Sequence, residues 1–402
     1  MKIMNVMLSR GRGGIQQAFL NYNKLIKYLG FHLIAVTSYG AKISSEVSES
    51  FSVPNLFNYD PISILSIGFK IKTENPAIII AHGNRAINFV ILATMWFRKK
   101  PIIIGVAHNY SYKYIIKCDH IFCLTSNQLT SLLLEKISPQ KLHLMPNFID
   151  TQDSRINRPL LQTQAPCKLV KADGAKGPEV AHKAHEDQGT VPEAQLQLGV
   201  EFPEGSNIDP PKKKVFTIGA MGRLVKKKGF DVLIRAVYHF VLTGESIKLI
   251  IAGDGEERDN LRKLTKLLSL DEYVKFTGWA SDKEKFFRDI DVFCLPSIEE
   301  PFGIIILEAM LNHTPIIATR TDGPLDLIEN NHNGILVNIN STEEFLEAIV
   351  KFKQNKDFAS NCAKNAYKNL LTTHNIENAT ILFSRNLNKI INNEISNFET
   401  IK

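Results

Sequence analysis

The chain has 402 residues, of which 44% are hydrophobic and 22% charged, and its formal net charge is +7. This length and composition are typical of a soluble protein of two or three globular domains and exclude fibrous, collagen-like and wholly disordered proteins. The basic residues are spread along the sequence, so we expect an anionic ligand or an anionic membrane surface as a partner and no nucleic acid.

The cysteines and the apolar runs indicate the cellular setting. The five cysteines are an odd number with no paired short spacing, which favours neither a disulfide framework nor a Cys-based metal site and fits a reducing compartment. The first residues, MKIMNVMLSRGRGG, turn glycine-rich too early for a signal peptide. Because no apolar run approaches the roughly 20 residues of a membrane span, we expect a cytoplasmic protein, with peripheral attachment to the inner face of the cytoplasmic membrane as an extension of that expectation.

Residues 1–150 alternate short apolar runs with amphipathic segments. Continuous apolar strands that alternate with helices predict a parallel sheet covered on both faces. The expected strands are residues 2–8, 31–38, 77–83, 101–108, 120–125 and 142–147, and helices are expected over 15–29 and 86–97. This stretch is predicted to form an N-terminal Rossmann-like domain.

Residues 151–211 interrupt this pattern. They are rich in Gln, Lys, Glu, Ala, Gly and Pro and show no strand or helix period, which predicts a disordered insertion or linker. His182 and His185 stand three apart there, but they have no acidic or Cys partner that would favour a metal site.

The alternation resumes at residue 215 and predicts a second doubly wound domain over residues 212–375, followed by a polar helical tail over 376–402. The expected strands are residues 215–222, 247–255, 273–279, 291–297, 315–320 and 334–338. The expected helices are residues 229–243, 256–268, 282–289, 302–312, 324–330 and 342–353. Ligands of such sheets bind beyond the carboxyl ends of the strands, so the residues that follow each strand are the candidate site.

One apolar run, residues 302–307, has a carboxylate near each end, Glu300 and Glu308. A charge in apolar surroundings is costly unless a partner or a polar ligand compensates it. Pro301 and Gly303 predict a helix start here, whose free N–H groups bind anions. Along a helix the two carboxylates would lie roughly 12 Å apart, which is too far for a glycosidase pair and suits a nucleotide-sugar laid along the helix start. The alternative is that Glu308 pairs with an arginine and Glu300 is simply exposed.

Glycines and cations follow other strands of the second half. Gly222, Arg223 and Lys228 form a turn that can hold a diphosphate, although the same turn could be no more than a solvated basic loop. Gly253 belongs to a Gly-Asp-Gly turn, which by itself is a weak signal.

In the first half, Gly13 and Gly14 open a helix after the first strand, and His82 and His108 follow later strands. The spacing of these glycines does not match the dinucleotide fingerprint, so a nicotinamide oxidoreductase is the least favoured function.

Together these motifs resemble those of the retaining glycosyltransferases of the GT-B fold, the large family called group 1 or family four. The resemblance covers nearly the whole chain except residues 151–211. It is carried by Gly13-Gly14, His82-Gly83, His108-Asn109, residues 146–150, Gly222-Arg223-Leu224, residues 228–231, residues 253–255, Gly278, Pro296-Ser297, residues 300–303, Glu308-Ala309, Gly323-Pro324 and Asn333-Gly334. It implies an α/β fold of two doubly wound Rossmann-like domains that face each other across a cleft.

The resemblance also implies roles for the matching residues. Those with an implied catalytic part are His108 near the transferred sugar, Glu300 on the sugar hydroxyls, and Arg223 and Lys228 on the donor diphosphate. Those implied to bind the donor are Gly14, Arg223, Lys228, Gly253, Phe302, Gly303, Ile304 and, on the ribose, Glu308.

The implied reaction transfers a sugar from a UDP- or GDP-sugar to a hydroxyl of a glycan or lipid-linked acceptor, with retention, in lipopolysaccharide or other cell-envelope polysaccharide or glycolipid synthesis. Beyond the donor no cofactor is expected. Because no Asp-x-Asp motif stands at a strand end, we expect Arg223, Lys228 and the helix dipole to neutralise the leaving diphosphate without a metal ion.

Two alternatives stay open: a catalytically impaired protein that only binds sugar nucleotides, and an epimerase on the same fold. The acceptor is the least specified part of the sequence. A set of cations in the first half suits an anionic membrane or is merely solvated: Arg10, Arg12, Lys99, Lys100, Lys113 and Lys117.

Overall fold

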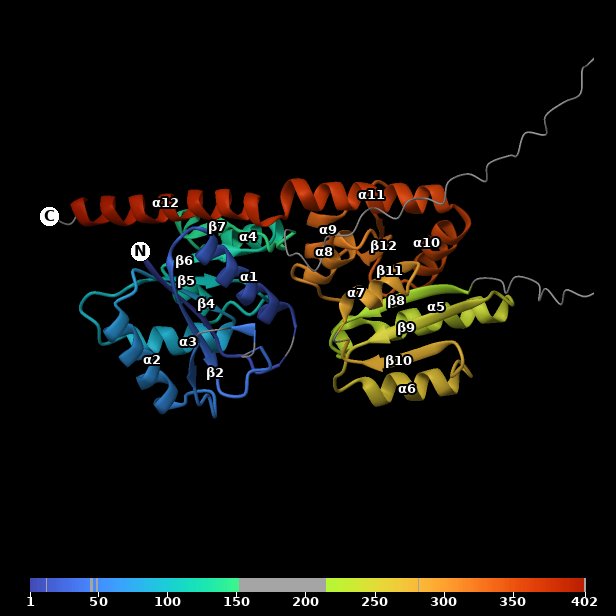
Figure 1. Ribbon diagram of the computed structural model, residues 1–402, viewed down its shortest axis with the longest axis horizontal. Helices are drawn as coiled ribbons and strands as arrows, with labels where there is room; N and C mark the ends of the chain where they lie inside the picture. The colour runs from blue at the N-terminus through green and yellow to red at the C-terminus, as the bar shows by residue number, and fades with distance from the viewer. Residues whose placement is uncertain (12, 44–45, 48–49, 152–214, 281, 401–402) are drawn as a thin grey trace, which may run out of the picture. The chain divides into compact units, whose positions relative to one another are not determined.

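The computed structural model describes residues 1–11, 13–43, 46–47, 50–151, 215–280 and 282–400. The predicted insertion 151–211, apart from Thr151, lies outside these residues, as do its His182 and His185 and the cation Arg12. The described residues contain two sheets, and every strand pair in both is parallel (Figure 1).

The first sheet has seven strands in the order β3-β2-β1-β4-β5-β6-β7. They are β1 (Lys2–Met7), β2 (His32–Ser38), β3 (Ser50–Val53), β4 (Ile78–His82), β5 (Ile102–Val106), β6 (His120–Cys123) and β7 (Leu142–Leu144). The connecting helices include α1 (Gly14–Tyr28), α2 (Pro61–Glu74), α3 (Asn84–Thr94) and α4 (Ser126–Leu134). The central strands are buried on both faces, which explains their unbroken apolar sequences.

The second sheet has six strands in the order β10-β9-β8-β11-β12-β13. They are β8 (Phe216–Met221), β9 (Ile247–Ala252), β10 (Val274–Gly278), β11 (Val292–Leu295), β12 (Ile316–Thr319) and β13 (Ile335–Val337). Its helices are α5 (Phe230–Leu242), α6 (Arg258–Leu267), α7 (Lys283–Arg288), α8 (Ile304–Leu311), α9 (Asp322–Leu327) and α10 (Thr342–Gln354). The predicted α/β architecture of two doubly wound sheets is confirmed.

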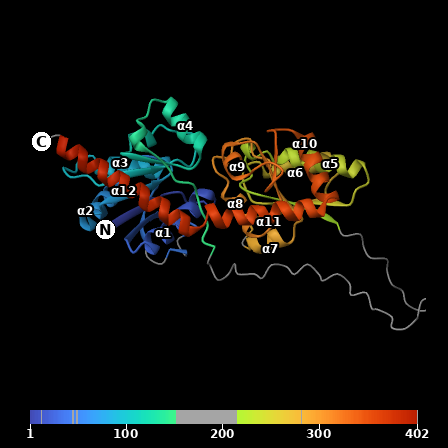
Figure 2. The same ribbon diagram turned by 90° about the horizontal axis from the view of Figure 1, so that it is seen from above.

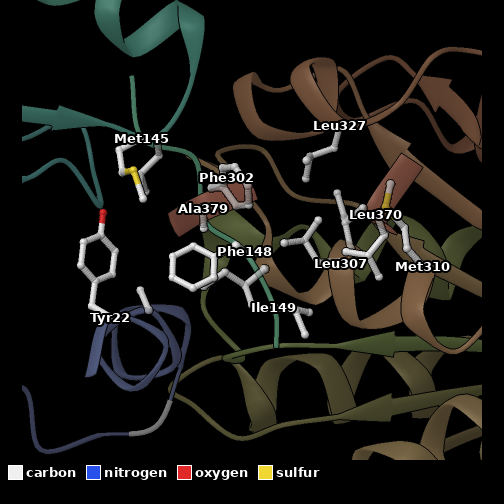
Figure 3. Packing of buried hydrophobic residues seen from close by; sticks show 14 of the residues in the cluster. Tyr22, Met145, Phe148, Ile149, Phe302, Leu307, Met310, Leu327, Leu370 and Ala379 are labelled. Carbon is white, nitrogen blue, oxygen red and sulfur yellow. The ribbon is translucent and has the colours of Figure 1, made fainter. Parts of the chain in front are cut away.

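Two long helices, α11 (Lys356–Thr373) and α12 (Ile376–Thr400), end the described chain. Figure 2 shows α12 lying beside α1. The prediction that this tail is polar was wrong for one of its faces, because Phe383, Leu387 and Ile390 are fully or almost fully buried. The same core cluster contains Tyr22 and Phe148 of the first sheet's side and Phe302 and Leu370 of the second (Figure 3).

Local sequence explains where several helices begin. Asp60 caps α2 by accepting a hydrogen bond from the Ile62 N–H at 3.1 Å, and Pro61 occupies the first turn, where its missing N–H costs nothing. Among the described residues, no helix has both the length and the apolar character needed to cross a bilayer.

Candidate active site

The predicted site residues of the second domain follow β8, β9 and β11. Strand β8 lies between β9 and β11. From β8 the strand order runs to β9 and β10 on one side and to β11, β12 and β13 on the other, and open α/β sheets bind their ligands at such a reversal of strand order, called the switch point. Arg223 and Lys228 follow β8, and Glu300 follows β11. The sequence therefore places these three residues at the switch point of the sheet.

Lys228 and Glu300 form an ion pair within this loop cluster. Their side chains are 18% and 10% exposed, and the Ser297 hydroxyl lies 3.4 Å from the same carboxylate oxygen. The backbone holds the two loops together, since the Ile298 N–H donates to the Lys227 carbonyl at 2.8 Å. A lysine ammonium has three donors, so Lys228 can bind Glu300 and still reach an anion.

Gly229 makes this pairing possible. It has φ +59°, and a Cβ at this position would lie 2.3 Å from the Pro296 carbonyl oxygen. Only a glycine lets the loop after β8 approach the end of β11 so closely.

Glu308 lies in α8 and is paired on one oxygen only. Its Oε1 accepts from the Lys283 ammonium at 2.6 Å, and its side chain is 13% exposed. Its Oε2 is buried and, within the described part of the chain, has no hydrogen-bond partner. The alternative interpretation holds in part, because Glu308 does pair with a basic side chain, although this is a lysine and not an arginine. Its other part is wrong, because Glu300 is buried.

The start of α8 offers unpaired backbone donors. Gly303 is its N-cap with φ +86° and provides no side-chain cap, and Pro301 lies before the first turn rather than in it. Across the described residues, the Phe302 and Gly303 N–H groups donate to no other backbone group. The Phe302 and Ile304 side chains are buried, at 3% and 7% exposure. These residues can therefore contact an anion only through their backbone, where the positive end of the helix dipole lies.

Arg223 is exposed, and among the described residues its guanidinium makes no hydrogen bond or ion pair. Its charge is uncompensated, whereas those of Lys228 and Lys283 are balanced by Glu300 and Glu308. The cluster therefore has a net positive charge, as an anionic ligand requires.

Gly253 has a structural reason to be glycine. Its φ is +144°, and a Cβ would lie 1.8 Å from the Gly222 carbonyl oxygen. The turn after β9 thus packs directly on the turn after β8, next to Arg223, and this packing positions the Arg223 loop.

The first domain presents histidines at its own switch point, where β1 lies between β2 and β4. His82 Nδ1 lies 2.9 Å from His108 Nε2, and His82 Nε2 lies 2.8 Å from Asn5 Oδ1. Burial lowers the pKa of His108 to about 3, and burial together with His108 lowers the pKa of His82 well below its usual value. Both rings are therefore neutral near pH 7.

The hydrogen bonds of Asn5 determine which ring nitrogens of His82 and His108 carry a proton. Its Nδ2 donates to the Phe19 carbonyl at 3.2 Å, which can only accept. Its Oδ1 must then accept from His82 Nε2, so His82 Nδ1 accepts from His108 Nε2. His108 Nδ1 is left with a lone pair that can accept a hydrogen bond.

Gly14 begins α1, directly after β1. A Cβ there would meet nothing within 4 Å, and Gly13, the N-cap, provides no side-chain cap. The helix start is therefore open, with free N–H groups like those at the start of α8.

The described residues contain no group of three or more His, Cys, Asp or Glu that could hold a metal ion. An Asp-x-Asp sequence does occur at Asp289 and Asp291, but it precedes β11, at the opposite end of the strand from Glu300. Its Asp291 accepts a hydrogen bond from the Thr217 N–H at 2.8 Å.

Sequence reasoning missed Asn5 and Lys283. Lys283 follows β10 and meets Glu308 across 25 positions of sequence, and Asn5 lies inside β1, where the pattern predicts an apolar residue. A polar residue within an apolar strand was the available signal for Asn5.

Comparison with known proteins extends this description. Residues 202–369 match the family described as "Glycosyl transferases group 1". The lipopolysaccharide core biosynthesis glycosyltransferase LpsE of Rhizobium meliloti is 37% identical over 152 residues, which is 38% of this chain and 44% of LpsE. The capsular polysaccharide biosynthesis glycosyltransferase CapM of Staphylococcus aureus is 29% identical over 154 residues, 38% of this chain and 40% of CapM. The chain thus matches less than half the length of these curated relatives.

Solved structures match over nearly the whole chain. HepE of Anabaena, in complex with UDP and glucose, superimposes with a TM-score of 0.73 at 17% identity and covers 96% of this chain and 99% of its own. A glycosyltransferase from Rickettsia africae gives a TM-score of 0.68 at 19% identity, with 97% and 98% covered. The chain therefore has the two-domain α/β GT-B fold, and its second domain carries the match to the group 1 glycosyl transferases.

Proposed function

We propose that this protein transfers a sugar from a nucleoside diphosphate sugar to a hydroxyl group with retention of anomeric configuration. The observation that carries the proposal is the cluster at the β8–β11 switch point. There the Lys228–Glu300 pair joins the loops after β8 and β11, the uncapped start of α8 follows Glu300, and Glu308 within α8 has one buried oxygen without a partner in the described chain. The fold likeness to HepE, whose structure holds UDP and glucose, supports the same ligand class.

Each part of the cluster suits one part of such a donor. Arg223 and Lys228 bind the diphosphate, with the N–H groups at the start of α8 and, from the first domain, Gly14. The unpaired Oε2 of Glu308 accepts a hydrogen bond from a ribose hydroxyl. Glu300, oriented by Lys228, accepts hydrogen bonds from the sugar hydroxyls. Gly253 acts by positioning the Arg223 loop, and Ile304 flanks the phosphates through its backbone.

The transfer breaks the bond between the anomeric carbon and the diphosphate oxygen and forms one to the acceptor oxygen. The electron pair of the broken bond goes to the diphosphate, whose new charge Arg223, Lys228 and the α8 dipole stabilise. On the same face of the sugar, the leaving phosphate takes the proton of the acceptor hydroxyl. His108, neutral and with a free lone pair, lies beside the positive charge that develops at the anomeric carbon. Because these fixed charges neutralise the leaving group, we expect turnover to persist in EDTA.

Several curated relatives are named for lipopolysaccharide core or capsular polysaccharide synthesis. We propose that the acceptor is likewise a glycan or a lipid-linked glycan of the cell envelope, reached from the cytoplasmic face of the membrane. For this function we take residues 1–150 as the acceptor-side domain, 212–375 as the donor-binding domain and 151–211 as a linker. Residues 376–402 are a C-terminal helical segment, and its helix α12 packs on the first domain.

A screen of UDP-, GDP- and ADP-sugars for hydrolysis and for thermal stabilisation tests the donor. We expect one nucleotide series to be hydrolysed slowly and to raise the melting temperature, and NMR of the first-formed sugar to show the starting anomer. Stabilisation without hydrolysis, in both the full chain and a variant lacking residues 152–210, would instead identify a sugar-nucleotide-binding protein.

Glu308 gives a more specific test. Glu308→Ala is expected to raise the donor KM by roughly tenfold, the loss of about one hydrogen bond to a charged group, with little change in kcat. A donor with 2′,3′-dideoxyribose separates binding from folding: the wild type should discriminate against it, and the variant should not. Unchanged discrimination in Glu308→Ala would remove the residue from the ribose site.

A further inference from the structure

Helix α2 carries apolar side chains on the face that points away from the protein. Ile67 and Ile71 are buried against the first domain, whereas Ile62, Leu65 and Phe69 are 57%, 73% and 67% exposed. The spacing of 3 and 4 residues puts the exposed three in one row along the helix. A surface helix normally has polar residues on its solvent-facing side. These three apolar side chains are instead exposed, so no other part of the described chain covers them.

The row continues into neighbouring segments. Gly68 packs α2 against Ala93 of α3, whose Cβ lies 3.9 Å from where a Cβ on Gly68 would be, and Trp96 follows α3 at 86% exposure. The Tyr59 hydroxyl, before α2, lies 3.0 Å from the Tyr114 hydroxyl. The α2 face is defined here as Leu56, Phe57, Tyr59, Ile62, Leu65, Phe69, Met95, Trp96 and Ile116, all exposed.

The same segments are strongly basic. Residues 55–117 contain eight Lys and Arg against two Asp and Glu, a net charge of +6 out of +7 for the whole chain. One of the two acids, Asp60, is buried as the α2 cap, and the other, Glu74, is paired with Lys2 and Lys70. Lys72, Arg98, Lys99, Lys100, Lys113 and Lys117 are exposed. Arg10, also predicted to add charge, keeps its charge and donates to the Pro54 carbonyl at 2.6 Å.

We propose that the α2 face binds the surface of an anionic lipid bilayer. Apolar and aromatic side chains on a helix lying in the interface insert among the acyl chains, and lysines and arginines nearby bind anionic headgroups. A second copy of the chain fits less well, because an isologous contact would bring two basic surfaces together. The α2 face lies outside the proposed transfer site, so the two proposals can fail separately.

The two tryptophans of the chain, Trp96 and Trp279, allow a direct test with vesicles. In a Trp279→Phe variant, Trp96 reports on the α2 face, and its emission should shift to the blue with phosphatidylglycerol vesicles but not with phosphatidylcholine vesicles. In a Trp96→Phe variant, Trp279 in the second domain should show no shift. A shift of Trp279 alone, or of neither tryptophan, would overturn the proposal.

Co-sedimentation with the same vesicles measures the contribution of each part of the face. The pair Leu65→Ser/Phe69→Ser should weaken binding by roughly tenfold or more, while Leu242→Ser/Leu267→Ser, two exposed leucines of the second domain, should not. Lys99→Glu/Lys100→Glu should weaken it where Lys263→Glu/Lys266→Glu on α6 does not. Donor hydrolysis should be equal in all four variants.

Three outcomes would contradict a membrane surface. They are equal binding to neutral vesicles, equal loss in the control pairs, and a dimer in sedimentation velocity without vesicles that Leu65→Ser/Phe69→Ser dissociates. The last result would identify the α2 face as an interface between copies of the chain.

Discussion

Lys228 has a structural partner in Glu300 as well as a proposed role in binding the donor. Its partner Glu300 is 10% exposed, and within the described part of the chain its carboxylate has, besides Lys228, only the Ser297 hydroxyl at 3.4 Å. Loss of the ammonium would leave a buried carboxylate without its counter-charge, which is costly, and would remove a cation from the proposed diphosphate site.

We therefore predict that Lys228→Ala lowers kcat/KM for the donor by roughly 100-fold, equivalent to about 2.7 kcal/mol. The matched control is Lys227→Ala, because Lys227 pairs with Glu299 at 3.5 Å where both side chains are about half exposed, and such pairs contribute at most about 1 kcal/mol. Steady-state kinetics with varied donor compares them. Similar losses in the two variants would show that general positive charge, rather than the Glu300 pair, matters.

The buried histidines make stability depend on pH. In the folded protein the pKa of His108 is about 3 and that of His82 is far below normal, whereas both are about 6.5 in an unfolded chain. Between these two pKa values the unfolded state binds more protons than the folded state. The free energy of unfolding is therefore highest above pH ~6.5 and decreases as the pH falls toward ~3. Each histidine contributes at most about 1.4 kcal/mol per pH unit.

Urea denaturation at about pH 7.5 and about pH 5 measures this loss. His82→Gln should lose less stability between the two pH values than the wild type, because one buried imidazole with a strongly lowered pKa is gone. The exposed His239 provides the control, and His239→Gln should match the wild type. An equal loss in all three proteins would place the titrating groups elsewhere.

At the scale of elements, most of the architecture could be predicted, and the failures have physical reasons. Parallel strands buried on both faces read as continuous apolar runs, so the strands around β1 and β8 were found. Strand β3, with the sequence SFSV at the sheet edge, has no such run, and α2 has apolar residues on both faces, which hides the helical period. The second face of α2 is explained if a bilayer covers it.

The same reasoning separates the predictable part of the site from the rest. The positions of Arg223, Glu300 and His108 follow from strand ends, since carboxyl ends of parallel strands share one edge. The pairing of Glu308 with Lys283, and the fixed proton on His82, depend on contacts between distant segments that no local pattern encodes.

Two glycines at element boundaries, Gly253 and Gly14, differ in how much space surrounds them for a side chain. An alanine Cβ at Gly253 would lie 1.8 Å from a backbone oxygen, whereas at Gly14 it would meet nothing within 4 Å. We predict that Gly253→Ala strongly lowers the melting temperature. Gly14→Ala should leave it unchanged or raise stability by up to about 1 kcal/mol, since alanine favours the helix.

The Gly14→Ala variant then tests donor binding separately from stability. If the start of α1 approaches the donor phosphates, the added methyl should raise the donor KM without any loss of stability. Normal donor kinetics in a stable Gly14→Ala protein would remove Gly14 from the site.

At the scale of the whole molecule, the last helix completes the core of the first domain. Between α11 and α12 the chain returns to the first domain, where the Ile149 N–H donates to the His374 carbonyl at 2.9 Å. Beyond this point, Asn386 Nδ2 donates to the Leu144 carbonyl at 3.0 Å. The helix predicted as a tail is thus a structural part of the domain formed by the start of the chain.

Phe383 is the residue that tests this role. It is fully buried, and its ring packs edge-on against Tyr22 and Phe122, with centroids 6.1 and 5.9 Å away. Phe383→Ala would remove those contacts and leave a cavity, so we predict a loss of about 3–5 kcal/mol in urea denaturation. Ile381→Ala, at a 59% exposed position of the same helix, should cost less than about 1 kcal/mol. If both variants unfold like the wild type, α12 does not stabilise the first domain, and the chain could lose it without consequence for that domain.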